Sequence, residues 1–224
     1  MPIFKPKKDQ EWESFDDVLF PEERKSSLRV AGEFFIEIVK VALISLAIII
    51  PIRYFLIQPF YVKGASMEPN FHDNEYLIID EISYGIKVPF KGERVAEFTL
   101  PQRGDIVVFK YPYDTSQYYI KRVIGLPGEK ISIMDNQVKI YNKDYPEGKV
   151  LDESSYLSSE VLTPGDSDVI LGADEYFVMG DNRKASHDSR SFGPVAEKYI
   201  IGKVLLRGWP FNKFTVFKEA NYNF

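Results

Sequence analysis

Apolar residues are concentrated in one continuous stretch near the N-terminus of the chain. Residues 34–57, FFIEIVKVALISLAIIIPIRYFLI, contain only Glu37, Lys40 and Arg53 as charged residues. This length reaches the roughly 20 residues that an α-helix needs to cross a bilayer, and the long Lys40 and Arg53 side chains can extend toward opposite headgroup layers. Because the stretch has no polar face, it is unlike a buried helix of a soluble protein. We therefore expect a transmembrane helix over 34–57.

The flanks of this stretch predict its orientation. Residues 1–33 are polar, without the apolar period of a domain, and are expected to form a short tail. Three basic residues precede the apolar stretch closely, whereas only two follow it: Arg24, Lys25 and Arg29 against Arg53 and Lys63. The excess of positive charge predicts a cytoplasmic tail over 1–33 and an extracytoplasmic domain over 58–224.

Beyond residue 58 the pattern changes to short runs of β-branched and aromatic residues separated by turn residues, which indicates strands. Asp135-Asn136 predicts a tight hairpin, and residues 142–172, rich in Ser, Asp, Gly and Pro, predict a loop region. No long helical period follows the apolar stretch, so the domain is expected to be mostly β. The predicted strands are 76–80, 105–110, 118–124, 130–134, 137–141, 175–179, 202–207 and 214–217.

Composition excludes several classes of function. The net charge of −5 disfavours a nucleic-acid-binding protein, which usually carries a basic excess. The chain has no cysteine and only two histidines, His72 and His187, which excludes thiol catalysis and argues against a histidine metal centre. We expect neither a metal nor another cofactor.

Ser66 is the candidate nucleophile. It follows the apolar stretch closely and lies between Ala65 and Met67-Glu68-Pro69, a sequence that predicts a tight, accessible turn. A serine hydroxyl becomes a nucleophile only when a base accepts its proton. The sequence must therefore supply a base elsewhere.

Two residues are candidates for this base. His187 precedes Asp188, but adjacent side chains do not point at one another, and a loop histidine is usually solvated. Lys121 lies in the predicted strand 118–124, where it shares a face with Tyr119 and Val123. An apolar face favours the neutral amine, although a lysine extending past Tyr119 to water would fit the same pattern. Lys121 is the better candidate because of a resemblance to a known family.

The chain resembles the bacterial type I signal peptidases, membrane-anchored Ser/Lys proteases of the export pathway. Four blocks in the family's order carry the resemblance, from the apolar stretch almost to the C-terminus. They are GASMEP over 64–69, RGDIVVF over 103–109, YIKRVIGLPG over 119–128 and GDNRKASHDSR over 180–190. The resemblance implies a β-rich, partly barrel-like catalytic domain on the outer face of the cytoplasmic membrane.

The resemblance also implies roles for individual residues. Ser66 matches the nucleophile and Lys121 the general base. Ser186 matches a serine that orients the lysine amine, Asp188 and Arg190 match a charged pair that braces the site, and Asp181 belongs to the same supporting loop. Without the resemblance, residues 181–190 would be interpreted as a solvated polar loop.

One position departs from the pattern of part of the family. A side-chain hydroxyl two residues before the nucleophile helps to hold the oxyanion in some members, and here that position is Gly64. The Ser66 backbone N–H is then the expected donor, while Gly64 allows a substrate strand to approach closely. Met67, Tyr119 and Ile120 are candidates for the walls of a shallow substrate pocket, with ordinary core packing as the alternative.

The resulting hypothesis is a membrane-bound serine endopeptidase that cuts exported preproteins after a small-x-small motif. One alternative is a self-cleaving repressor of the SOS type, but residues 1–33 are too short and too acidic to form its DNA-binding domain. A second alternative is a non-catalytic membrane-tethered β-domain that binds a protein partner. For the aromatic residues near the C-terminus, core packing is preferred over contact with lipid headgroups. These residues are Trp209, Phe211, Phe214 and Phe217.

Overall fold

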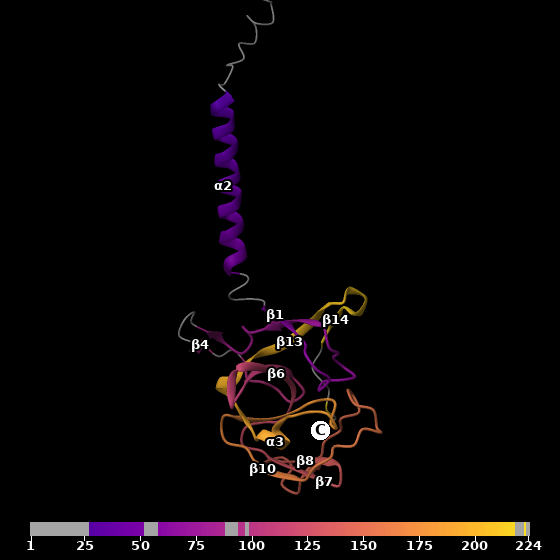
Figure 1. Ribbon diagram of the computed structural model, residues 1–224. Helices are drawn as coiled ribbons and strands as arrows, with labels where there is room; N and C mark the ends of the chain where they lie inside the picture. Colours follow the sequence, from indigo (N-terminus) through magenta and orange to yellow (C-terminus); the bar gives the residue numbers. More distant parts are fainter. Residues whose placement is uncertain (1–26, 52–57, 88–93, 97–98, 218–221, 223–224) are drawn as a thin grey trace, which may run out of the picture. The chain divides into compact units, whose positions relative to one another are not determined.

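The structure is a computed structural model that describes residues 27–51, 58–87, 94–96, 99–217 and 222 (Figure 1). Its contacts divide the chain into two compact units, Met1–Ile49 and Ile50–Phe224.

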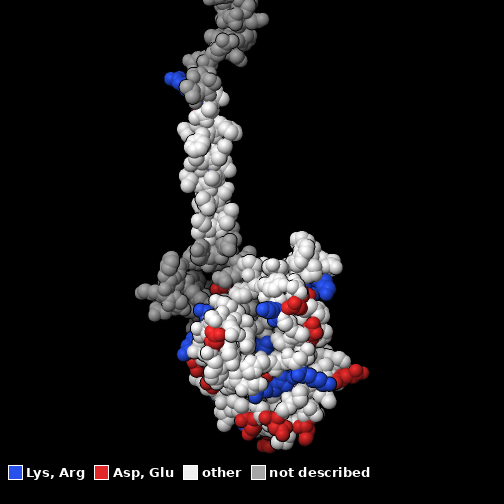
Figure 2. Space-filling model, viewed as in Figure 1, with Lys and Arg blue, Asp and Glu red and all other residues white. Residues whose placement is uncertain are grey.

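Helix α2 (Ser27–Pro51) is the only long helix in the described part of the chain. It begins earlier than predicted, because residues 27–33, expected in the tail, are helical. Residues 1–26 and 52–57 lie outside the described residues. The large apolar side chains of α2 are exposed, including Phe34 at 67% and Val41 at 63%, and the visible face of the helix carries almost no charge (Figure 2).

No helix among the described residues combines the length and apolarity that crossing a membrane requires. The transmembrane helix expected over 34–57 is therefore not confirmed.

The second unit is built on an eight-stranded antiparallel sheet that contains most of the predicted strands. Its path ends at β1 on one side and at β12 on the other, so the described strands form an open sheet and not the partly barrel-like closure that the resemblance implied. In order across the sheet, the strands are β1 (Gln58–Tyr61), β2 (Tyr76–Asp80), β13 (Ile200–Trp209), β5 (Ile106–Tyr111), β6 (Asp114–Gly125), β11 (Glu175–Met179) and β12 (Val195–Ala196), with β14 (Thr215–Val216) paired to β13.

A smaller sheet has the order β10-β7-β8-β9. The predicted hairpin joins β7 (Lys130–Met134) to β8 (Gln137–Tyr141), and its two turn residues have positive φ values, 52° for Asp135 and 62° for Asn136. This is the geometry of a two-residue type I′ turn, so the hairpin prediction is confirmed. The expected loop 142–172 contributes two short strands, β9 (Lys149–Val150) and β10 (Ser167–Ile170).

The remaining elements are short. Strands β3 (Ile86–Lys87) and β4 (Arg94–Ala96) pair with each other. The helical turns are α3 (Ser189–Phe192), η2 (Glu197–Tyr199) and η3 (Phe211–Lys213). The described part of the second unit is therefore mostly β, as the sequence predicted.

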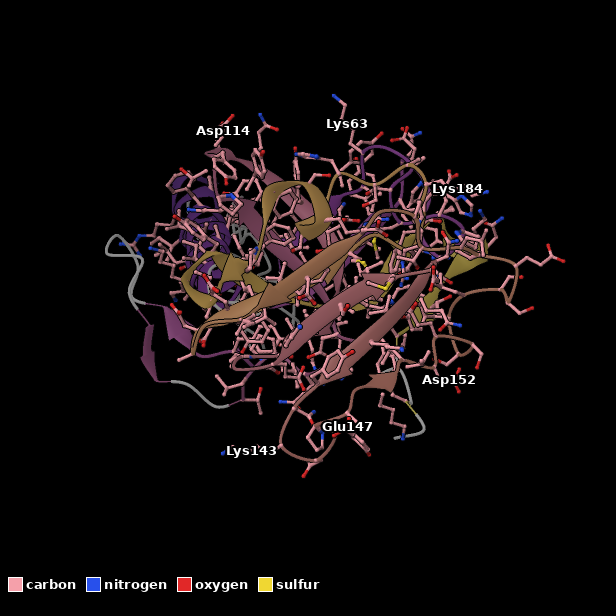
Figure 3. All side chains as sticks on the ribbon, turned by 90° about the horizontal axis from the view of Figure 1, so that it is seen from below. Lys63, Asp114, Lys143, Glu147, Asp152 and Lys184 are labelled. Carbon is pink, nitrogen blue, oxygen red and sulfur yellow. The ribbon has the colours of Figure 1, made fainter. Side chains whose placement is uncertain are left out.

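Strand β5 is apolar without alternation because both of its faces are buried. Val107 and Phe109 pack in one cluster with Val123 and Val178, whereas Ile106 and Val108 belong to a second cluster around Met67, Phe71 and Leu77. A third cluster lies between the smaller sheet and the ends of β6 and β11. Charged side chains such as Lys63, Asp114 and Lys184 point outward from this unit (Figure 3).

The aromatic residues near the C-terminus do not all pack in the core. Trp209 is 47% exposed, Phe211 76% and Phe214 57%, so the core-packing prediction is wrong for these three. Phe217 does pack inward, with its ring 4.6 Å from that of Phe71. The turn between β13 and β14 thus presents an exposed apolar surface, which we call the aromatic tip (Trp209, Phe211 and Phe214).

Candidate active site

The turn that carries Ser66 is held in place by apolar side chains that are buried in the core. Met67 is 1% exposed and Phe71 fully buried, and the Phe71 N–H donates to the Met67 carbonyl at 2.9 Å. Gly64 precedes the turn with a φ of 94°, a value that L-residues rarely adopt, and its N–H donates to Asp73 Oδ1 at 2.7 Å. With Met67 buried, Ser66 faces the opposite side and remains partly accessible.

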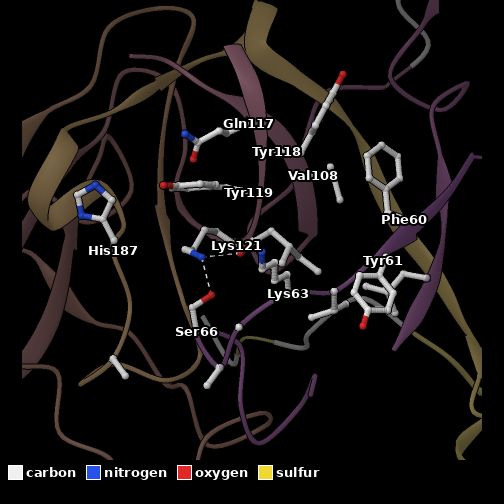
Figure 4. A pocket seen from close by; sticks show the side chains of 16 residues that line it. Phe60, Tyr61, Lys63, Ser66, Val108, Gln117, Tyr118, Tyr119, Lys121 and His187 are labelled. Atoms are coloured by element: carbon white, nitrogen blue, oxygen red, sulfur yellow. Dashed lines mark hydrogen bonds between the residues drawn. The ribbon is translucent and has the colours of Figure 1, made fainter. Parts of the chain in front are cut away.

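Lys121 lies opposite Ser66 on β6, beside Val107 of β5. Its Nζ donates to Ser66 Oγ at 2.7 Å and to the Ile120 carbonyl at 2.8 Å (Figure 4). The residue is 3% exposed. Burial lowers the pKa of Lys121 to about 8, although the nearby charges of Asp188 and Asp181 act in the opposite direction. An amine that loses its proton at this distance can accept the proton of the serine hydroxyl.

Two buried ion pairs support the loop that follows β11. Arg122, next to Lys121, donates from Nε and Nη2 to both carboxylate oxygens of Asp181 at 2.8 and 2.7 Å. Arg190 forms the same type of pair with Asp188, at 2.9 and 2.8 Å. Burial would raise the pKa of Asp188, but Arg190 and the Gly180 N–H more than offset this, and the pKa lies below its usual value.

Ser186 lies against Gly180. Its hydroxyl is buried and interacts with the Asp188 carboxylate, which contributes to the lowered pKa of Asp188, whereas it makes no hydrogen bond with Lys121. A Cβ at position 180 would collide with Ser186 Oγ and with the Ser66 carbonyl oxygen. The absence of a side chain at 180 therefore allows the loop to pack directly on the nucleophile turn.

Asn182 and Asn70 connect the same elements but were not singled out from the sequence. The Asn182 backbone N–H donates to the Ser66 carbonyl at 3.0 Å, and its Nδ2 donates to the Ala65 carbonyl at 3.1 Å. Asn70 Nδ2 donates to Asp181 Oδ2 at 2.8 Å. The only sequence signal was the position of Asn182 in the Gly-Asp-Asn turn.

Ser66 and Lys121 line a cavity of about 640 Å³. Phe60, Tyr61 and Val108 lie on one side, and Tyr119 and His187 lie on the other (Figure 4). Of the four residues expected to form a substrate pocket, Gly64, Tyr119 and Ile120 line the cavity, whereas Met67 is part of the buried core.

His187, the competing base, is exposed and belongs to an aromatic group. Its Nε2 lies 3.3 Å from the Tyr111 hydroxyl, and its ring packs edge-on against Phe192 with centroids 5.3 Å apart. No hydrogen bond joins it to Ser66 among the described residues. The described residues also contain no group of three or more His, Cys, Asp or Glu side chains that could hold a metal ion.

Comparison with known proteins places this chain among signal peptidases. Residues 35–209 match the family described as signal peptidase, peptidase S26. Signal peptidase I of Pseudomonas fluorescens is 31% identical over 198 residues, covering 74% of this chain and 70% of that protein. Signal peptidase I of Leptolyngbya laminosa is 31% identical over 201 residues, covering 86% of this chain and 89% of that protein.

Among solved structures, the crystal structure of a signal peptidase I from Enterococcus faecalis is 32% identical, covers 47% of this chain and 97% of that chain, and has a TM-score of 0.38.

The family match and the two sequence relatives identify the protein as a peptidase, a hydrolase of peptide bonds. The chain belongs to the signal peptidase family, peptidase S26.

Proposed function

We propose that this protein is a serine endopeptidase that removes signal peptides from exported preproteins, with Ser66 as nucleophile and Lys121 as general base. The observation that carries this proposal is the 2.7 Å hydrogen bond between Lys121 Nζ and Ser66 Oγ at a lysine only 3% exposed. A desolvated amine at this distance provides the base that the serine requires.

The reaction proceeds in two stages. Neutral Lys121 accepts the Ser66 proton as Oγ attacks the scissile carbonyl, and the resulting ammonium donates that proton to the departing amine, leaving an ester on Ser66. Lys121, neutral again, then accepts a proton from the water that attacks the ester. The products are the free acid and regenerated Ser66, so each proton taken up by Lys121 is returned.

The edge of β6 offers a place for an extended substrate. Residues 118–121 pair with β5 on one side, whereas β11 pairs with β6 only from Arg122 onward. The other edge at 118–121 is therefore unpaired among the described strands, and it borders the cavity through Tyr118, Tyr119 and Ile120. A peptide added along this edge would form backbone hydrogen bonds and place alternate side chains in the cavity. A small-x-small motif fits this alternation.

We further propose that the chain is anchored to the cytoplasmic membrane by residues 34–57, with 1–33 inside and 58–224 outside. The exposed apolar side chains of α2 support this proposal, because large exposed apolar surfaces usually mark contact sites. The aromatic tip is a second such surface, and aromatic side chains favour the membrane interface.

The catalytic proposal is tested by incubating the detergent-solubilised protein with a preprotein whose signal peptide ends in a small-x-small motif. We expect Ser66→Ala and Lys121→Met to lose cleavage, and His187→Ala to retain it. Lys184→Ala is the matched lysine control, because Lys184 is exposed and points outward (Figure 3). Wild-type rates in Lys121→Met would refute the dyad.

The membrane proposal is tested by fractionation after expression. We expect the full chain to sediment with membranes and to resist extraction by high salt or alkaline carbonate. Release of the whole protein by carbonate would contradict anchoring by residues 34–57. Protease digestion of spheroplasts checks the orientation, since residues 58–224 should be digested from outside.

A further inference from the structure

We infer that Asn182 is a positioning residue that orients the Ser66 backbone N–H as the oxyanion donor. This inference rests on the proposed function, because an oxyanion forms only if Ser66 attacks a carbonyl. It assigns to Asn182 the support that a side-chain hydroxyl at position 64 cannot provide here.

Position 64 offers no side-chain donor near Ser66. Gly64 has no side chain, and its φ of 94° disfavours any L-residue at that position. The Ser66 N–H makes no hydrogen bond within the described part of the chain. A free backbone N–H adjacent to the attacking oxygen is the usual type of oxyanion donor.

The direction of the Ser66 N–H is set by the orientation of the Ala65–Ser66 peptide plane. The Ala65–Ser66 peptide bond is trans, so the Ala65 carbonyl and the Ser66 N–H point in opposite directions within one rigid plane. Asn182 Nδ2 holds the Ala65 carbonyl at 3.1 Å. The Glu68 backbone N–H donates to the same carbonyl at 3.2 Å within the turn, and the side-chain amide of Asn182 adds the hydrogen bond from outside the turn. Together they fix one end of this plane and therefore the direction of the N–H at the other end.

Asn182 is itself held in place by its backbone and by its neighbours. Its backbone N–H holds the next carbonyl, that of Ser66, at 3.0 Å, so two consecutive peptide planes are held by one residue. Asp181, the preceding residue, is 1% exposed and paired with Arg122. The neighbouring Gly180 contacts the Ser66 carbonyl closely. Asn182 therefore projects from a braced loop, and a braced donor loses little orientation during the reaction.

The experiment uses Asn182→Ala and Asn182→Asp in the full-length protein, with Lys184→Ala as the control from the same loop. Both Asn182 variants keep the backbone hydrogen bond to Ser66 and remove the side-chain donor. Kinetics on a preprotein-derived peptide provide kcat and KM. Affinity for a peptide boronic acid, whose adduct with Ser66 places a boronate oxygen at the oxyanion position, reports on the donor directly.

We expect kcat to fall by about 10²-fold in both variants, the magnitude typical of an impaired oxyanion donor. Boronate affinity should fall by a similar factor. Binding of the unreacted peptide, measured on a Ser66→Ala background, should change by less than about threefold, because ground-state binding does not use the oxyanion donor. In Asn182→Ala, which adds no charge near Lys121, the acid limb of the pH profile should stay in place. Lys184→Ala should match wild type.

The inference is overturned if a folded Asn182→Ala keeps wild-type kcat, or if peptide and boronate affinities fall equally, which would indicate a purely structural role. Asn182→Asp preserves the side-chain volume and serves if Asn182→Ala does not fold. Failure of the proposed function looks different, because cleavage would then persist in Ser66→Ala.

Discussion

The protonation of Lys121 should control the rate in a predictable pH range. With a pKa of about 8, about one-tenth of the amines are neutral at pH 7 and about one-hundredth at pH 6. If neutral Lys121 is the base, kcat/KM should rise about tenfold per pH unit below pH 8 and become constant above it.

The lowered pKa of Lys121 also makes the free energy of unfolding depend on pH. The folded state releases the Lys121 proton at about pH 8, and the unfolded state releases it near the ordinary value of 10.5. Between these values the unfolded chain binds one proton more, so the free energy of unfolding rises with pH by about 1.4 kcal/mol per unit. Over the whole interval the gain is about 3 kcal/mol, and Lys121→Met lacks it.

The assay combines a pH–rate profile with urea unfolding of wild type and Lys121→Met in detergent. Taking the difference between the two proteins removes the titration of shared tyrosines. We expect the wild type to gain about 3 kcal/mol relative to Lys121→Met from about pH 8 to about pH 10.5. A flat difference would refute the lowered pKa. An acid limb that disappears in His187→Ala would instead identify histidine as the base.

Three further predictions follow from the site and its surroundings. Gly180→Ala should lower kcat/KM by at least about tenfold, because the added Cβ would collide with Ser186 Oγ and the Ser66 carbonyl oxygen. Gly208→Ala is the control, since the nearest atoms to its Cβ are 3.8 Å away, and equal rates in the two variants would contradict the prediction. Arg183→Met should lower the free energy of unfolding, measured in urea, by about 3–5 kcal/mol, because Arg183 has 0% side-chain exposure and its loss leaves the Glu153 carboxylate without its guanidinium partner. A loss below about 1 kcal/mol would show the pair to be dispensable. A chelator and a thiol reagent should leave cleavage unchanged, because the chain has no cysteine and the described residues contain no metal-binding group; inhibition by either would contradict the proposed chemistry.

The strand predictions were accurate where a run of strand-forming residues is bounded by turn residues. Strands β2, β7, β8 and β11 have the predicted bounds, because β-branched and aromatic residues in runs bounded by turn residues specify strands locally. Strands of two residues, such as β3, β9 and β12, were missed because so short a run carries no period.

The aromatic tip shows where local pattern fails. Trp209, Phe211 and Phe214 are as apolar as the core residue Phe217, and composition alone favoured burial for all four. Whether an aromatic side chain is buried depends on what packs against it, and here the turn between β13 and β14 projects from the sheet and leaves these three side chains exposed (Figure 1).

By itself, the sequence determined the residue types of the site and a mostly β domain. It singled out Ser66 on a turn and Lys121 on a strand, and the order of the four blocks indicated the family. Only the tertiary structure decided that these two residues, 55 positions apart, lie 2.7 Å from each other. That distance depends on the pairing of β5 with β6 and on the burial of Met67, which are long-range contacts and leave no periodic signal in the chain. The same reason kept Asn182 hidden, since a side-chain amide that holds a carbonyl 117 residues away looks like any other turn residue in sequence.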